Sequence, residues 1–256
     1  MKRIITLAAA AMALALMLLP APALAGDAGN VARVTYWTIR DGHEADFEAG
    51  LKAHNQLHVD QQDPNALLTW QIVTGKRNGQ YLRGSFGHDW ADFDQESATA
   101  EADAADSAKN IDPHIAGAEP VFGVAMPELS NPGSGGPRGV SQVIYFHVRP
   151  GKQQQFQGVI GKIHAALGKV EGGWPSYLWW ELATGSLPTY VVSLPRDNWA
   201  GFAAGDTPLG AAVAAEYGPE ETKKIFEALG DAVEHEHSYI SVLRADLSYM
   251  PAPAAE

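Results

Sequence analysis

The feature that most constrains this chain is a segment that occurs twice. VARVTYWTIRDGHEADF, residues 31–47, matches VSQVIYFHVRPGKQQQF, residues 140–156, without a gap. A later pair of matches is WQIVTG at 70–75 and WELATG at 180–185. A spacing of about 110 residues is too long for a solenoid unit and suits a small domain. The sequence therefore predicts a tandem duplication, with one repeat at 26–128 and the other at 140–249.

Each copy alternates between strand-like and helix-like patterns. In the first copy we expect strands at 33–39, 67–73, 80–86 and 121–126, with helices from 43 to a stop at 63–65 and from 90 to 110. In the second we expect strands at 141–148, 177–183, 189–194 and 238–247, with helices at 152–169 and 208–232.

This order, βαββαβ in each copy, is that of a ferredoxin-like domain, which has an antiparallel sheet with both helices on one face. The other face of such a sheet needs a cover, and a second copy on the same chain supplies one. We therefore predict an α+β fold of two tandem ferredoxin-like repeats packed sheet to sheet as an internal pseudo-dimeric α/β barrel.

The N-terminus has the features of a secretory signal peptide. A basic start, an apolar run over residues 4–19 and small residues up to Ala25 predict cleavage near Ala25, so that 1–25 would be removed. An uncleaved anchor is the alternative, but the apolar run is short for a membrane span. We expect a periplasmic or secreted protein with no stable membrane anchor. A Gly/Pro-rich linker is expected at 129–139 and a frayed tail at 250–256.

The composition of the chain limits the kinds of partner and ligand that it can be expected to bind. Without Lys2 and Arg3, 16 basic residues would face 30 acidic ones, which argues against nucleic acid and anionic membranes. The chain has no cysteine and therefore no disulfide or thiolate chemistry. It also lacks the glycine-rich nucleotide motifs and the Gly-x-Ser-x-Gly motif of serine hydrolases. Its seven tryptophans suit a small apolar or aromatic ligand.

The openings of the two copies carry a family resemblance. VTYWTIRDG at 34–42 and VIYFHVRPG at 143–151 each run through a glycine turn into a helix with an aromatic residue, Phe47 or Phe156. In this the chain resembles the dimeric α/β-barrel superfamily, particularly the branch around antibiotic-biosynthesis monooxygenases. That superfamily includes cofactor-free oxygenases, isomerases, and haem-dependent chlorite dismutases and dye peroxidases. The resemblance implies monooxygenase- or isomerase-like chemistry, but no motif transfers catalytic residues position by position.

The first helices of the two copies differ in their inward stripe. His54 and His58 stand where the second copy has Ile163 and Leu167. Two imidazoles four residues apart on a helix can share a metal ion or pair a base with a second proton carrier. We take them as candidate catalytic residues and assign no metal, because the sequence identifies no third ligand. Alternatively, a tilted helix leaves His58 in solvent and His54 bonded to a backbone carbonyl.

A second candidate group lies in the second repeat. If two strand faces coincide, Tyr145, His147, Trp179 and Glu181 form an aromatic pocket in which His147 and Glu181 act as a proton-abstracting pair. The alternative is a polar cluster between packed sheets. The candidate ligand-binding residues are Tyr36, Trp70, Tyr145 and Trp179.

Other histidines are weaker candidates. His164 or His54 would be the axial ligand if the protein bound haem, and His235 and His237 have a zinc-like spacing but are expected at a solvated helix-to-strand junction. The sequence names no cofactor, and we expect none. It favours an exported small-molecule-binding protein, with a non-catalytic binding or interaction protein as the alternative and a metal or haem protein as a third possibility.

Overall fold

The computed structural model describes residues 29–94, 99–133, 137–203 and 207–252. The predicted signal peptide, its cleavage at Ala25 and the last four residues of the tail lie outside the described residues. Within the described ranges, no helix is long and apolar enough to cross a membrane.

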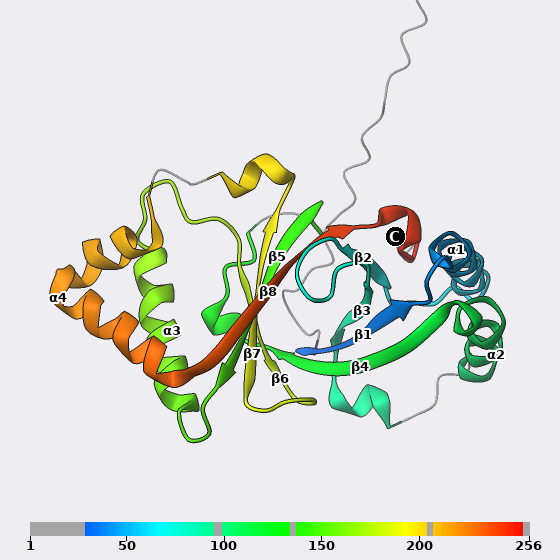
Figure 1. The fold of residues 1–256 in the computed structure, drawn as a ribbon, viewed down its shortest axis with the longest axis horizontal. Helices are drawn as coiled ribbons and strands as arrows, with labels where there is room; N and C mark the ends of the chain where they lie inside the picture. Colours follow the sequence, from blue (N-terminus) through cyan, green and yellow to red (C-terminus); the bar gives the residue numbers. More distant parts are fainter. Residues whose placement is uncertain (1–28, 95–98, 134–136, 204–206, 253–256) are drawn as a thin grey trace, which may run out of the picture.

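The same order of elements occurs in both halves of the chain (Figure 1). The first half contains β1 (Val31–Ile39), α1 (Glu44–Asp60), β2 (Leu68–Ile72), β3 (Tyr81–His88), α2 (Ala100–Asn110) and β4 (Ile115–Ala125). The second half contains β5 (Val140–Val148), α3 (Gln153–Leu167), β6 (Leu178–Leu182), β7 (Thr189–Arg196), α4 (Leu209–Ala232) and β8 (Val233–Leu243).

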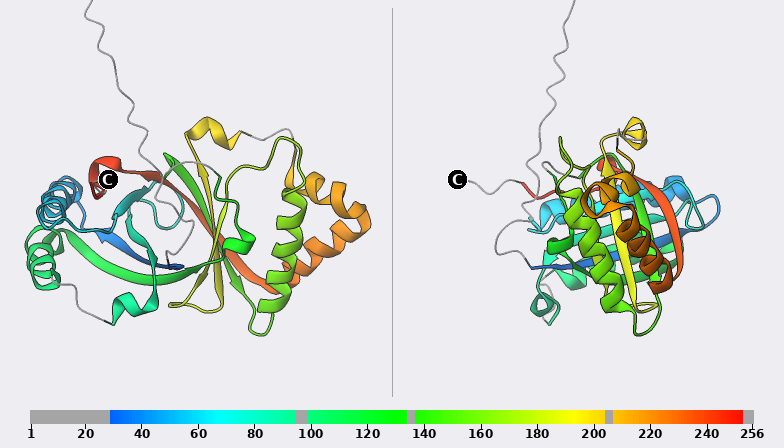
Figure 2. Two further views of the ribbon diagram at one scale, coloured as in Figure 1. Left: turned by 180° about the vertical axis from the view of Figure 1, so that it is seen from behind. Right: turned by 90° about the vertical axis from the view of Figure 1, so that its left-hand side faces the viewer.

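The eight strands form one closed antiparallel barrel in the order β1-β3-β2-β8-β5-β7-β6-β4. Pairs β2–β8 and β4–β6 join the halves, so the two sheets meet edge to edge as well as face to face. Closure pairs the backbone groups that open sheet edges would leave free. Helices α1 and α2 lie on one side of the barrel and α3 and α4 on the opposite side (Figures 1 and 2). The predicted α+β class and barrel architecture are thus confirmed.

Alternation along the strands separates the barrel interior from two outer cores. In β1, Tyr36 faces the interior, whereas its neighbour Trp37 packs toward α1. The buried interior residues are Tyr36, Ile72, Val121, Val143, Tyr145, Val191 and Tyr239. The core beneath α1 is small, and the core beneath α3 and α4 is larger and includes Phe156, Ile160, Trp179 and Tyr190.

The segment after the last strand of each half crosses to the other half. Leu247, after β8, is buried in the core beneath α1, and Leu129, after β4, packs on the core beneath α3. The hydroxyl of Ser248 accepts the Thr69 N–H at 2.9 Å, and the hydroxyl of Ser130 accepts the Trp179 N–H at 2.9 Å. The first residues of the predicted linker therefore pack against α3.

One expectation about a helix is wrong. The helix expected from Trp90 is a separate 3₁₀ turn, Trp90–Phe93, closed by a capping box between Asp89 and Asp92, and α2 begins at Ala100. Trp90 and Trp199, which begin the corresponding 3₁₀ turns of the two halves, are 50% and 53% exposed.

Candidate functional site

Helix α1 brings His54 and His58 together beneath α2. The inward stripe of α1 consists of Phe47, Leu51, His54 and His58, all buried. The two imidazoles are only 5% and 6% exposed. The alternative with a tilted helix and a solvated His58 is therefore wrong, because α2 covers this end of α1.

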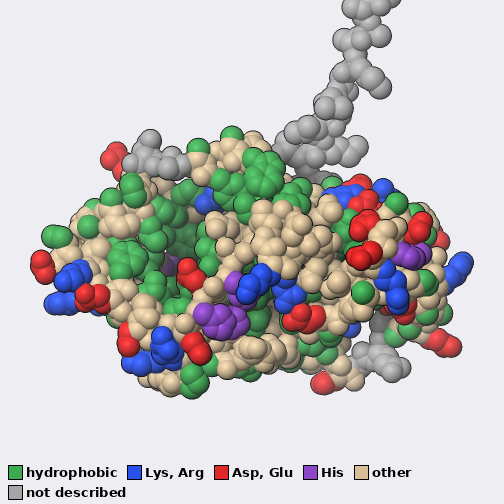
Figure 3. Space-filling view, in the orientation of Figure 1, with side chains coloured by type: hydrophobic (Ala, Val, Ile, Leu, Met, Phe, Trp, Pro, Cys, Tyr) green, Lys and Arg blue, Asp and Glu red, His purple; other side chains and the backbone are tan. Residues whose placement is uncertain are grey.

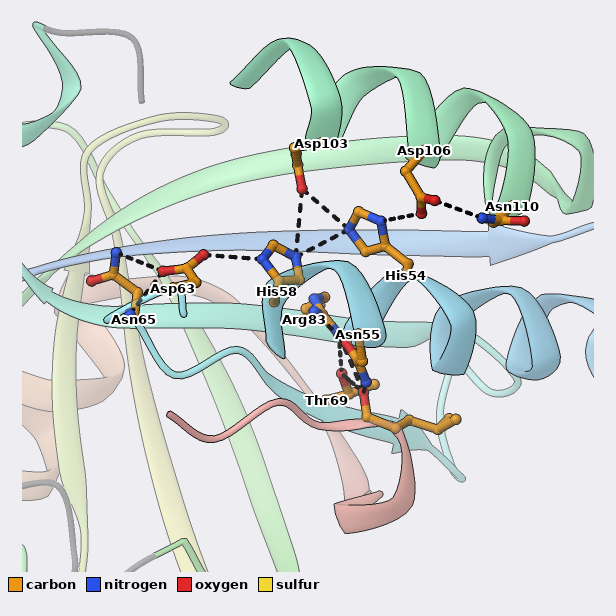
Figure 4. Close-up of polar contacts among 11 residues, drawn as sticks. His54, Asn55, His58, Asp63, Asn65, Thr69, Arg83, Asp103, Asp106 and Asn110 are labelled. Atoms are coloured by element: carbon orange, nitrogen blue, oxygen red, sulfur yellow. Dashed lines mark hydrogen bonds and ion pairs between the residues drawn. The ribbon is translucent and has the colours of Figure 1, made fainter. Parts of the chain in front are cut away.

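Three aspartates surround the two imidazoles (Figure 4). His54 Nδ1 lies 2.8 Å from Asp106 Oδ2, and His58 Nδ1 lies 3.0 Å from Asp63 Oδ2. The two Nε2 atoms face each other at 3.2 Å. Asp103 Oδ1 lies 3.3 Å from His54 Nε2 and 3.4 Å from His58 Nε2. Both rings are thus held at both nitrogens.

The outer aspartates are themselves oriented. Asn110 donates its side-chain amide to Asp106 Oδ1 at 2.9 Å, and the backbone N–H of Asn65 donates to Asp63 Oδ1 at 2.8 Å (Figure 4). Such bonds fix the carboxylate that in turn fixes the imidazole.

The positively charged side chain of Arg83 is buried beneath α1, next to this cluster. The Arg83 guanidinium, 7% exposed, donates to Asn55 Oδ1 at 2.7 Å and to the Leu247 carbonyl at 3.2 Å. Burial lowers its pKa to about 10. It connects β3, α1 and the crossing segment.

The electrostatics favour neutral His58 and ionised Asp103. Burial, followed by the proximity of His54 and Arg83, lowers the pKa of His58. The hydrogen bond from His54 lowers the pKa of Asp103. Sequence analysis missed the aspartates, although Asp103 and Asp106 are spaced to share one face of α2.

The second cluster lies on the interior side of β5 and β8. His147 stacks on His235, with ring centroids 4.1 Å apart, and is 5.3 Å from the ring of His237. His147 Nδ1 lies 3.0 Å from the Thr189 hydroxyl. Burial lowers the pKa of His147 and of His237, so both are neutral at pH 7. The expected helix-to-strand junction lies just before these histidines, where α4 ends at Ala232 and β8 begins at Val233; His235 is exposed, and both histidines pair with β5.

A tyrosine cluster continues from these histidines into the barrel. Tyr145 stacks on His237 at 4.7 Å, its hydroxyl is hydrogen-bonded to that of Tyr36, and Tyr36 also contacts the Tyr239 hydroxyl at 3.0 Å. Burial raises the pKa of all three phenols, so they remain protonated. The guanidinium of Arg77 lies 4.3 Å above the Tyr36 ring.

The structure does not assemble the predicted pocket of Tyr145, His147, Trp179 and Glu181. Tyr145 and His147 face the interior, whereas Trp179 packs against Phe156 beneath α3. Glu181 lies on that outer side too and accepts the Tyr190 hydroxyl at 3.0 Å. Register explains the difference, since odd-numbered residues face inward on β5 and outward on β6.

Trp70 lies apart from the other candidates. It meets Phe86 at a ring distance of 6.1 Å, and Phe86 meets Trp180 at 5.8 Å. Trp180 belongs to the barrel interior. These rings pack one another where the two halves join, so the described contacts of Trp70 are those of a structural residue.

A cleft of about 340 Å³ opens between α4 and the sheet of the second half. Figure 3 shows hydrophobic side chains around a hollow on this side of the molecule. The lining residues are Phe146, Phe226, Leu229, Gly230, Val233, His235 and Glu236. The cleft therefore reaches His235, the most exposed member of the histidine stack. A second cleft, of about 370 Å³, is more polar and is lined by Trp174, Arg196 and their neighbours.

The described residues do not fit a haem at the predicted positions. His164 is hydrogen-bonded to the Tyr177 hydroxyl at 2.8 Å, and the inward face of α3 beside it is packed with Phe156, Ile160 and Ile163. His54 is held by carboxylates and His58. Our expectation that no cofactor is needed stays a prediction.

Similar folds occur in solved structures. A candidate monooxygenase from Lactobacillus acidophilus superposes with a TM-score of 0.53 at 10% identity, covering 86% of this chain and 96% of that one. A candidate monooxygenase from Fusobacterium nucleatum gives 0.52 at 9% identity, covering 84% and 93%. A mutant chlorite dismutase from Candidatus Nitrospira defluvii gives 0.52 at 10% identity, covering 86% and 93%.

These likenesses show the fold, and the chain has the dimeric α/β-barrel fold predicted from its sequence. No family model matches the sequence. No curated protein matches it either.

Proposed function

We propose that this protein is exported and binds a small apolar or aromatic molecule in the cleft between α4 and the second-half sheet. The observation that carries the proposal is the apolar lining of that cleft next to His235. Ligand pockets combine mostly apolar walls with a few polar groups that orient the ligand. The net negative charge of the chain suits an uncharged ligand better than an anionic one.

Proton transfer is the chemistry that this cleft supports best. His235 meets the cleft, and neutral His147 lies behind it. A neutral imidazole accepts a proton from an acidic C–H or O–H group, and a stacked neighbour and the Thr189 hydroxyl can position it. Isomerisation through an enolate begins with such a deprotonation, and so does oxygenation that proceeds through a substrate carbanion. Monooxygenase-like or isomerase-like activity is therefore the proposed reaction class, and the neighbouring structures described as monooxygenases support it by analogy.

The matching contacts of the two halves support a tandem origin. Paired serine bonds, crossing segments and element order repeat in both, as expected for two ferredoxin-like copies that form a pseudo-dimer within one chain. In this proposal the second copy carries the ligand cleft, and the first carries the buried histidine pair.

A plug in the cleft tests binding. Gly230 lines the cleft, and a side chain begun there meets no atom within 4 Å, so Gly230→Phe fills the space without disturbing the backbone. Gly210→Phe, in the same helix and equally unobstructed, is the matched control. With 2-naphthol as the probe in calorimetry, we expect binding to the wild type and to Gly210→Phe and loss of binding in Gly230→Phe. Equal binding by all three proteins contradicts the proposed cleft.

Proton transfer is tested separately. We expect the wild type to accelerate deuterium incorporation from D₂O into the enolisable ketone 2-tetralone, followed by NMR, and His235→Asn to lose this acceleration while still binding the ketone. If binding occurs without exchange, the protein is the non-catalytic binding protein that is the alternative.

A further inference from the structure

We propose that His54, His58 and Asp103 form a binding site for one divalent transition-metal ion of the zinc class, between α1 and α2. The site lies on the opposite side of the barrel from the apolar cleft (Figure 1). It therefore stands or falls independently of the proposed ligand site.

The distances between the three ligand atoms fit a metal ion. The two Nε2 atoms are 3.2 Å apart, and Asp103 Oδ1 is 3.3 Å from one and 3.4 Å from the other. A tetrahedral zinc ion lies about 2.0–2.2 Å from nitrogen and oxygen ligands, which places those ligands about 3.3 Å from one another. A single hydrogen bond would fix one of these distances, whereas a shared ion accounts for all three.

The tautomers implied by the outer aspartates leave three electron-pair donors facing each other. Each Nδ1 lies against a carboxylate oxygen, of Asp106 or of Asp63, and must carry the proton of that hydrogen bond. To bind a metal ion, each ring must then offer the lone pair of its Nε2 atom, and these two atoms and Asp103 Oδ1 already face one another.

The surroundings are those of a metal site with an organised outer layer. Metal-binding histidines usually donate their second ring N–H to a carboxylate or carbonyl, which fixes the ring and increases its basicity. Both histidines have that arrangement, and Asn110 and Asn65 orient the two carboxylates (Figure 4). The second half, with Ile163 and Leu167 at the matching positions of α3, buries apolar side chains instead.

The charges of the surrounding side chains favour a divalent cation. Histidines bind metal ions as neutral imidazoles, and three carboxylates, of Asp63, Asp103 and Asp106, contact this pair, with the buried Arg83 guanidinium nearby. Their charges leave an excess of two negative charges, which one divalent ion balances. Imidazole and carboxylate ligands suit zinc and related first-row ions better than calcium or magnesium, which prefer oxygen alone.

The site is open on one side. The Asp103 side chain is 43% exposed, whereas the two histidines are buried. An ion can therefore enter past α2, and its fourth position is left for water, as in zinc sites with three protein ligands.

Metal titration tests the inference. The full exported chain is stripped with EDTA and titrated with Zn²⁺ by calorimetry and with Co²⁺ by absorption, because tetrahedral Co²⁺ absorbs strongly in visible light. We expect one ion per chain for both metals. Asp106→Asn, which leaves all three ligands in place, should weaken binding by about 10- to 100-fold, and Asp103→Asn should weaken it further.

The controls separate this site from other metal-binding groups. Two further clusters of histidines exist in the described residues, so His235→Asn and His114→Asn should leave Zn²⁺ affinity unchanged. Because Asp103 and Asp106 lie at the surface of α2, circular dichroism should show both Asn variants folded. The inference is overturned if the wild type binds no Zn²⁺, which would mean that protons alone hold the cluster, or if Asp103→Asn binds as well as the wild type.

Discussion

Replacing Leu247 with alanine should destabilise the protein more than any comparable change in the crossing segments. The Leu247 side chain is fully buried, among Phe47, Leu51, Tyr81 and Ile111 beneath α1. A Leu→Ala change at a site that cannot collapse costs about 3–5 kcal/mol, because the lost transfer free energy is joined by the cost of a cavity. The equivalent Leu129 is only partly buried, so Leu129→Ala should cost about 1 kcal/mol.

Urea unfolding followed by tryptophan fluorescence measures both costs. We expect a lower midpoint with an unchanged slope, since the surface exposed on unfolding is the same. The crossing segment also supports α1, because the Leu247 carbonyl accepts bonds from Asn55, Thr69 and Arg83. Equal losses in the two variants would refute the conclusion that the segment after β8 completes the first core while its counterpart only covers the second.

Three further predictions concern pH, the barrel interior and export. Burial lowers the pKa of His58, His147 and His237. Below about pH 6.5, the unfolded chain therefore binds more protons than the folded one. The free energy of unfolding should decrease as the pH is lowered, until the folded pKa values are reached. Urea unfolding between pH 7.5 and 5 checks this, and His147→Asn should reduce the slope. Tyr36→Phe removes the hydroxyl that contacts two other buried phenols and should cost about 1–3 kcal/mol in thermal unfolding. Tyr217→Phe removes only an exposed bond to the Lys162 carbonyl and should cost less than about 0.5 kcal/mol. Mass spectrometry of the exported protein should show a chain that begins at Gly26, and an intact N-terminus would contradict the signal peptide.

The architecture was predictable because it depends on patterns that repeat. The strand-turn-helix openings at 31–47 and 140–156 identified corresponding elements in both halves, and alternation fixed which side of each strand is buried. Boundaries were less predictable. The start of α2 was misjudged because the Asp89–Asp92 capping box closes a separate turn, and β8 was placed too late because His235 and His237 look like surface residues until their pairing with β5 is known.

Only the part of the candidate site that lies on a single helix was predictable from the sequence. His54 and His58 stood out because the second copy has apolar residues at those positions, and a helical spacing places two residues on one face. Their carboxylate partners lie on other segments, at 63, 103 and 106, and acidic residues are too common on helix surfaces to mark a ligand. The pocket expected around His147 failed for a related reason, since it required the register between β5 and β6 to be known.

The way the barrel closes limits where function can lie in this chain. Each sheet edge is paired with a strand of the other half, and the interior is filled by three tyrosines and their aliphatic neighbours. Among the described residues, a ligand at the tyrosine cluster would have to displace a hydrogen-bonded phenol and leave buried hydroxyls without partners. Both proposed sites accordingly lie where helices meet the barrel or each other. The second half has filled its inner helix face and leaves a cleft beside α4, whereas the first has replaced apolar contacts with imidazoles and carboxylates between α1 and α2. Buried polar groups of this kind persist only with partners, and because the second half fills the same positions with apolar side chains, the histidine pair, rather than the larger apolar core, is where a bound ion should be sought.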